Sequence, residues 1–264
     1  MCVRFLRTRA RQWPEMRAAS AQWRRWVARQ LIMPVYRVPL TLTSRTGVRC
    51  RVDDDPVDDL VFKHVHGSGG SLYFPPVAIE EGGIVLDVGA HHGIYAMEAL
   101  RRYPTCRLIA VEPDPRAWRK IEANAALNGV ASRIEIIRAG LAMSGGHGWL
   151  ERSDEGSWGN RTRASDSRSA ASRTEPMVEL RTLDSILQGR RPSIVKCNAE
   201  GAEFALVPQL VALGLTPRLI VLMIHPESGN PDEPLDLLRG AGYRIEDADS
   251  PPKGYRFHCF SNRA

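Results

Sequence analysis

Short apolar runs alternate with helix-forming stretches from residue 84 onward, and this alternation constrains the fold more than any other feature of the chain. The clearest runs are Ile84–Val88, Leu108–Val111, Ile134–Ile137, Ser193–Cys197 and Leu219–Ile224. Each run has the length that is typical of a fully buried parallel strand. Between them the sequence favours helices, for example over 92–102 and 116–128. Alternating β and α units of this size predict a doubly wound α/β fold.

Three segments lie outside this pattern. Residues 1–33 form a basic arm, in which we expect one helix from Glu15 to Met33, and residues 34–80 read as a small accessory cap. Residues 151–176 are rich in Ser, Arg, Gly and Thr, so we expect a flexible loop or lid there. The main domain is therefore predicted to span residues 81–264.

Net charge argues against a nucleic-acid enzyme. The chain carries +6, but residues 1–30 hold eight arginines and one acid, a local +7, so the other residues sum to −1. Phosphate binding needs clustered Lys and Arg, and residues 31–264 have no net positive charge that would indicate such a cluster. No apolar run reaches the length of a membrane span. The five scattered cysteines form no CxxC pair, which favours a reducing compartment, and we expect a cytoplasmic protein.

The basic arm interleaves its arginines with Trp13, Trp23 and Trp26. One interpretation is a surface-seeking helix that contacts anionic lipid at a membrane surface or a protein partner. The alternative is a terminal arm or a helix that packs on the domain. In either case we expect that removing residues 1–30 leaves ligand binding intact.

Polar residues follow the predicted strands, where ligands bind in open α/β sheets. The first strand runs into Asp87-Val88-Gly89-Ala90-His91-His92-Gly93, whose G-x-x-x-G spacing differs from the dinucleotide pattern G-x-G-x-x-G. The second strand ends at Glu112, where a carboxylate can accept both hydroxyls of a ribose. Together these features indicate an adenosine ligand that carries no pyrophosphate.

This pair of motifs resembles the first two motifs of class I S-adenosylmethionine-dependent methyltransferases. Further on, Thr182-Leu183-Asp184-Ser185 and Lys196-Cys197-Asn198-Ala199-Glu200-Gly201-Ala202-Glu203 resemble the FkbM methyltransferase family, whose signature reads T-L-D-x and then K-x-D-x-E-G-x-E. The resemblance covers about residues 80–247. It implies a Rossmann-like, seven-stranded, mostly parallel sheet with an antiparallel last strand.

The resemblance also implies where S-adenosylmethionine would bind. Asp87 and Gly89 would contact its methionine portion, Glu112 its ribose, and the segment at Ala139 and Gly140 would border its adenine. The expected donor-binding set is Asp87, Gly89, His91, Gly93, Glu112, Ala139, Gly140 and Asn198. His91 stands where the family usually carries Asn, and Asn198 where it carries Asp.

Methyl transfer to a hydroxyl requires removal of the acceptor proton, and a His or carboxylate tuned near neutrality can remove it. The candidates are His225, which follows the fifth strand, and then Glu200. Glu200 and Glu203 can also be carboxylates that merely favour a helix N-terminus. We expect no metal, because His91 and His92 have no further ligand near them in the sequence.

The expected function is transfer of a methyl group from S-adenosylmethionine to a hydroxyl of a small metabolite or sugar, with no nucleic-acid partner. A catalytically degenerate donor-binding or scaffold protein is the alternative. A different nucleotide-binding protein of the NAD type is disfavoured, because G-x-G-x-x-G is absent.

Overall fold

The computed structural model describes seven ranges of the chain, which are residues 13–32, 40–52, 56–67, 72–152, 160–164, 176–249 and 255–261. Residues 1–12 of the basic arm and most of the expected 151–176 loop lie outside these ranges, so the flexibility predicted for that loop stays a prediction. Among the described residues, no helix has the length and apolar character that crossing a membrane requires.

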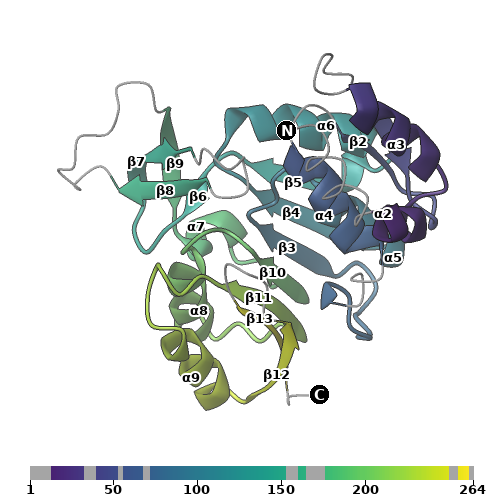
Figure 1. The fold of residues 1–264 in the computed structure, drawn as a ribbon. Coiled ribbons are helices and arrows are strands. Elements are labelled where there is room, and N and C mark those ends of the chain that lie inside the picture. The colour runs from purple at the N-terminus through teal and green to yellow at the C-terminus, as the bar shows by residue number, and fades with distance from the viewer. Residues whose placement is uncertain are drawn as a thin grey trace.

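The main sheet has seven strands, namely β3 (Ile84–Val88), β4 (Arg107–Val111), β5 (Ile134–Ile137), β10 (Ile194–Cys197), β11 (Leu219–Ile224), β12 (Tyr243–Asp249) and β13 (Tyr255–Ser261). Their order across the sheet is β12-β13-β11-β10-β3-β4-β5 (Figure 1). Neighbours from β11 to β5 pair in parallel, whereas β13 pairs antiparallel with β11 and β12. The predicted α/β class, with a mostly parallel sheet and an antiparallel last strand, is confirmed.

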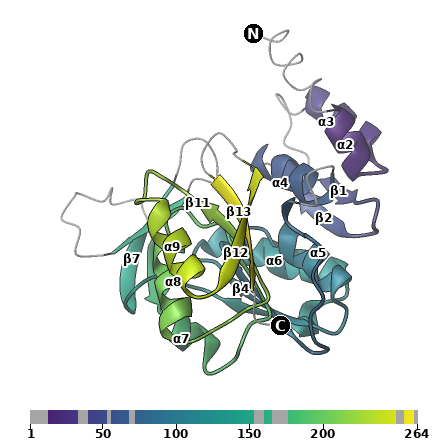
Figure 2. The same cartoon turned by 90° about the horizontal axis from the view of Figure 1, so that it is seen from below.

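Helices cover both faces of this sheet (Figure 2). One face carries α5 (Ile94–Arg102) and α6 (Pro115–Leu127), and the other carries α7 (Leu183–Leu187), α8 (Glu203–Ala212) and α9 (Asp232–Gly240). Successive strand residues point to opposite faces, so Val85 joins the α5 core while Leu86 and Val88 join the α7–α9 core. Burial on both faces explains why these strands read as unbroken apolar runs.

The predicted cap contains a hairpin of β1 (Leu40–Thr43) and β2 (Arg49–Val52), followed by α4 (Pro56–His66). α4 packs against α5, so the cap lies beside the parallel sheet on its α5 side (Figure 1). Phe62 of α4 is fully buried in the same core as Leu100 of α5.

The basic arm forms two helices where one was expected, α2 (Trp13–Ala19) and α3 (Trp23–Ile32). The break falls at Ser20, whose hydroxyl donates to the Thr43 carbonyl at 2.7 Å and accepts from the Gln22 N–H at 3.0 Å. Serine side chains compete with helix hydrogen bonds in this way. Met16, Ala19 and Trp26 have no exposed surface and belong to the same core as β3 and α5. The described part of the arm therefore packs on the domain.

A second, four-stranded sheet differs from the predicted organisation. It consists of β6 (Gly140–Leu141), β7 (Gly146–Glu151), β8 (Arg161–Ala164) and β9 (Met177–Arg181) in the order β6-β9-β7-β8. The expectation that 151–176 is all loop is thus wrong at residues 161–164. β7 has few apolar residues, and only Leu150 on it is a large buried side chain, so its sequence carries no clear strand signal.

Candidate active site

A pocket opens at the carboxyl ends of β3, β4, β5, β10 and β11, where the strand-end motifs meet. Eight of the ten predicted site residues line it, and these are Gly89, His91, Glu112, Ala139, Gly140, Asn198, Glu200 and His225. Asp87 and Gly93 do not line it. The topology thus brings together residues that are separated by up to 136 positions in the chain.

The turn after β3, residues 89–93, is tightly built. Gly89 and Gly93 have φ of 74° and 76°, and His91 has φ of 51°, a left-handed value that is uncommon outside glycine. A Cβ on Gly89 would lie 2.2 Å from the carbonyl oxygen of Asn198, so the turn passes directly against the loop after β10. Only glycine allows this approach.

Asp87 lies beneath this turn and not in the pocket wall. Its carboxylate is fully buried and lies 2.8 Å from the ammonium of Lys196, which also donates to the Gly89 carbonyl at 2.8 Å. Burial raises the pKa of Asp87, and the charge of Lys196 opposes that rise. Asp87 therefore supports the turn through Lys196, a residue whose role the motif did not reveal.

Glu112 is the carboxylate at the end of β4. One oxygen accepts the backbone N–H of His91 at 2.8 Å and the other accepts that of Asp114 at 2.9 Å. Burial raises the pKa of Glu112, and these two N–H donors oppose the rise. Each carboxylate oxygen has a further lone pair, so Glu112 can accept hydroxyl donors from a ligand in the pocket.

The wall beyond β5 combines an apolar part with two polar residues. Ala139 is fully buried. Gly140 lies close to Thr162 and Leu180, because a Cβ at this position would lie 3.0 Å from the Thr162 methyl carbon. Asn160 and Arg161, next to or on β8, complete this side. The sequence did not predict that β8 contributes to the pocket, because its residues lie in the segment 151–176 that was expected to be a loop.

His225 is held between two carboxylates. Its Nδ1 lies 3.0 Å from an oxygen of Glu203, and its Nε2 lies 3.4 Å from an oxygen of Glu200. Burial on its own would lower the pKa of His225, but the hydrogen bond that its ring donates to Glu203 and the charges of Glu203, Glu200 and Glu227 together raise it. Burial raises the pKa of Glu200, against the charge of His225. Glu203 thus does more than favour the N-terminus of α8: it fixes the ring of His225.

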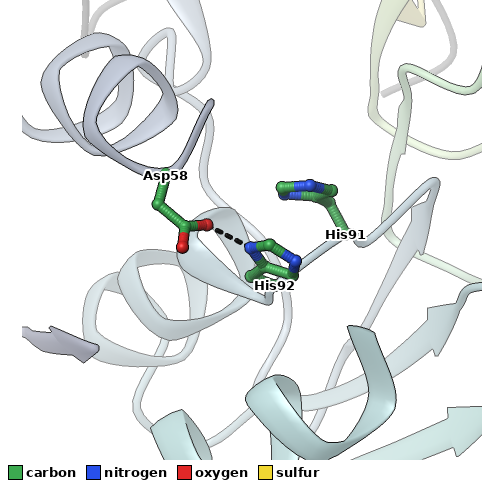
Figure 3. A group of neighbouring side chains, drawn as sticks. All are labelled: Asp58, His91 and His92. Atoms are coloured by element: carbon green, nitrogen blue, oxygen red, sulfur yellow. Dashed lines mark hydrogen bonds and ion pairs between the residues drawn. The ribbon is translucent and has the colours of Figure 1, made fainter. Parts of the chain in front are cut away.

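A second group of titratable side chains lies at the outer side of the same turn (Figure 3). Asp58 of α4 contacts Nδ1 of His92, and ligand atoms of Asp58, His91 and His92 lie within 4.8 Å of one another. The expectation that the two histidines have no further ligand nearby is therefore wrong: Asp58, 34 residues away, gave no local signal.

This group nevertheless has the geometry of an ion-paired network. The second oxygen of Asp58 lies 3.2 Å from the ammonium of Lys120, which would repel a cation. The ring centroids of His91 and His92 lie 3.6 Å apart, with the two ring planes inclined by 29°. Burial raises the pKa of Asp58, but the hydrogen bond from His92 and the charges of His92 and Lys120 outweigh it and lower the pKa to about 2. We assign no metal to this group.

The sequence profile of the "Methyltransferase FkbM domain" matches residues 87–245, which is more than half of the chain. The chain belongs to the FkbM methyltransferase family. The FkbM match begins at Asp87 and ends within β12, so the arm and the cap lie outside it.

Three individual proteins resemble parts of this FkbM chain. The methyltransferase sdnD of Sordaria araneosa is 32% identical over 62 residues, 24% of each chain. The ribosomal protein L11 methyltransferase of Pelotomaculum thermopropionicum is 38% identical over 63 residues, 24% of this chain and 20% of that protein. The crystal structure of methyltransferase FkbM from Methylobacillus flagellatus KT matches with a TM-score of 0.50 and 15% identity, over 72% of this chain and 47% of that one. The matched segments thus span about a quarter or less of the curated relatives and under half of the crystallised FkbM chain.

Two FkbM positions that differ here both lie at the pocket. His91 directs its backbone N–H to Glu112, a role that does not depend on its side chain. Asn198 donates its backbone N–H to the Val88 carbonyl at 3.1 Å, and its neutral side chain stands where the family motif has a carboxylate.

Proposed function

We propose that this FkbM chain transfers a methyl group from S-adenosylmethionine to a hydroxyl of a small metabolite or sugar. The observation that supports the proposal is the placement of Glu112 and His225 on one pocket, with the Gly89–Gly93 turn between their strands. The ribose-type carboxylate and a titratable proton acceptor therefore face the same space.

The residues present fit the sulfonium donor. Glu112 keeps lone pairs for ribose hydroxyls, Ala139 and Gly140 offer an apolar wall to the adenine, and Gly89 lets the backbone approach the methionine end. Acidic strand ends also suit a cationic ligand better than a pyrophosphate. The donor supplies a methyl group that is already activated, so the chain must align it, exclude water and take a proton.

His225 is our first candidate for the base that accepts this proton, and Glu200 is the second. Glu203 orients the imidazole so that Nε2 faces Glu200, and Glu200 is 11% exposed at the pocket. A His with a raised pKa accepts a proton readily once it is neutral. Glu200, with its raised pKa, is a stronger base than an ordinary carboxylate.

Product formation tests this proposal. The full chain is incubated with S-adenosylmethionine and fractionated metabolite extracts, and S-adenosylhomocysteine is quantified over time. We expect acceptor-dependent product from wild type and a loss of it in Glu112→Gln. Product that forms without any acceptor, or equally in the variant, contradicts the proposal.

A catalytically degenerate donor-binding protein is the second candidate, because two observations favour it. Asn198 replaces a carboxylate of the family motif, and both ring nitrogens of His225 already face carboxylates. This candidate predicts tight donor binding with no methylated product in single-turnover experiments with labelled donor. Any acceptor that becomes labelled excludes it.

We also propose a cytoplasmic location, with the basic arm as a contact for an anionic membrane surface or a protein partner. Cys50, Cys106, Cys197 and Cys259 are free and buried, which suits a reducing compartment. Flotation with vesicles containing phosphatidylserine, compared between the full chain and an Arg24→Gln/Arg25→Gln variant, tests the membrane arm. Equal flotation of both chains contradicts it.

A further inference from the structure

Helix α4 is attached to the rest of the molecule through charged residues on its buried side. Asp58 pairs with His92 and Lys120, whereas its neighbour Asp59 pairs with Arg29 of α3 at 3.3 Å. Asp58 has no exposed surface and Asp59 has 4%. Two adjacent, buried, ion-paired carboxylates thus connect one helix to two different parts of the molecule.

Asp58 reaches the turn that the proposed donor approaches. His92 follows His91, whose backbone N–H donates to Glu112 at 2.8 Å. The carbonyl of His92 accepts from the side chain of Asn124 at 2.9 Å. The turn is therefore fixed on its outer side by α4 and α6, and on its inner side by Glu112.

This support matters because the turn is strained. His91 adopts φ of 51°, which a non-glycine residue keeps only where its surroundings hold it. Among the described residues, two contacts hold His92 from outside the turn: its ring contacts Asp58, and its carbonyl accepts a hydrogen bond from the Asn124 side chain. Releasing the His92 ring would let the peptide of His91 rotate away from Glu112.

We propose that Asp58 is a positioning residue for the methyl donor: through His92 it holds residues 89–93 in the conformation in which Glu112 and the turn can bind the donor together. The inference rests on the proposed function, since it concerns the same donor. It extends the site into the cap, which lies outside the FkbM match.

Asp59 provides a matched control on the same helix. Asp58→Asn and Asp59→Asn each remove one buried negative charge from one helical turn, so both are expected to lower the melting temperature. Only Asp58 touches the donor turn. A purely structural role for Asp58 would leave donor affinity unchanged in the folded protein, as in Asp59→Asn.

The experiment is calorimetric titration of S-adenosylhomocysteine into the full-length wild type and both variants, after circular dichroism has shown that each is folded. We expect Asp58→Asn to bind at least about tenfold more weakly, because small displacements of a binding group have large effects. Asp59→Asn should stay within about twofold of wild type. His92→Gln, which keeps the Asp58–Lys120 pair, should weaken binding like Asp58→Asn and replaces it if that variant does not fold.

Two results overturn the inference in distinguishable ways. If wild type binds and both Asp58→Asn and His92→Gln bind within twofold of it, Asp58 does not position the donor site, and the proposed function stands. If wild type binds no S-adenosylhomocysteine, the proposed function fails and this inference fails with it.

Discussion

His225 and Glu203 meet at a single carboxylate oxygen: Oε1 of Glu203 accepts the backbone N–H of His225 at 2.7 Å and lies 3.0 Å from its Nδ1. The second oxygen of Glu203 accepts the Gly201 N–H at 3.0 Å, so this fully buried side chain ties the loop after β10 to the end of β11. The ring of His225 has one orientation as a result, and its Nε2 faces Glu200.

His225→Gln is expected to lower turnover by about 10²–10⁴-fold, because glutamine keeps hydrogen-bonding capacity but cannot take a proton. Donor affinity should change little, since Glu112 and the turn remain. Steady-state release of S-adenosylhomocysteine with a responsive acceptor measures the effect. Unchanged turnover would remove His225 as the base and leave Glu200.

The stability of the chain should depend on pH through His225. Its folded pKa is raised above the ordinary 6.5, so the folded state binds this proton more tightly than the unfolded state. The stabilisation is therefore complete below pH 6.5 and is lost as pH rises through the folded pKa. Urea unfolding of wild type and His225→Gln across this window measures it, and parallel curves for the two chains would refute the assignment.

The strand-end motifs could be predicted because each is local. Asp87 to Gly93 and Glu112 directly follow apolar runs, and parallel strands must place their carboxyl ends together. The five strands that pair in parallel followed from the same pattern, whereas the antiparallel last strand was implied by the resemblance to the methyltransferase family.

The contacts between distant segments could not be predicted in this way. Asp58 meets His92 only because α4 packs beside the turn, and an acidic residue in a helix gives no indication of its partner. β8 offers four residues, Arg-Thr-Arg-Ala, with no apolar run, and it is a strand because β7 pairs with it. Such strands owe their structure to tertiary context.

Gly89→Ala should destabilise the fold and abolish donor binding. The left-handed backbone costs about 1–2 kcal/mol for a non-glycine residue, and the new Cβ would lie 2.2 Å from the Asn198 carbonyl. Gly129→Ala is the control, because Gly129 has φ of 67° and nothing lies within 4 Å of its Cβ position. Chemical unfolding of both variants separates the backbone cost from the clash. Equal effects would show that the close approach to Asn198 is not needed.

Trp26→Ala should reduce stability by about 3–5 kcal/mol, as for a large side chain removed from a core. Trp26 is fully buried in the core that contains β3. Removing residues 1–30 is therefore also expected to destabilise the domain, whereas the sequence alone led us to expect that this deletion leaves ligand binding intact. Trp23→Ala, at a partly buried position, should cost less. Thermal unfolding tests this order, and no loss in Trp26→Ala would show that the arm is dispensable for folding.

Calorimetric titration tests the central claim most directly. The full-length wild type is titrated with S-adenosylhomocysteine and with NAD, and the Glu112→Gln variant is titrated with S-adenosylhomocysteine. Glutamine can offer only one oxygen to the two backbone N–H groups that Glu112 now accepts, and it loses the carboxylate. We predict one site for S-adenosylhomocysteine, no binding of NAD, and affinity weaker by at least about tenfold in the variant. Absence of binding, preference for NAD, or equal affinity in Glu112→Gln would contradict the assignment of this pocket to a methyl donor.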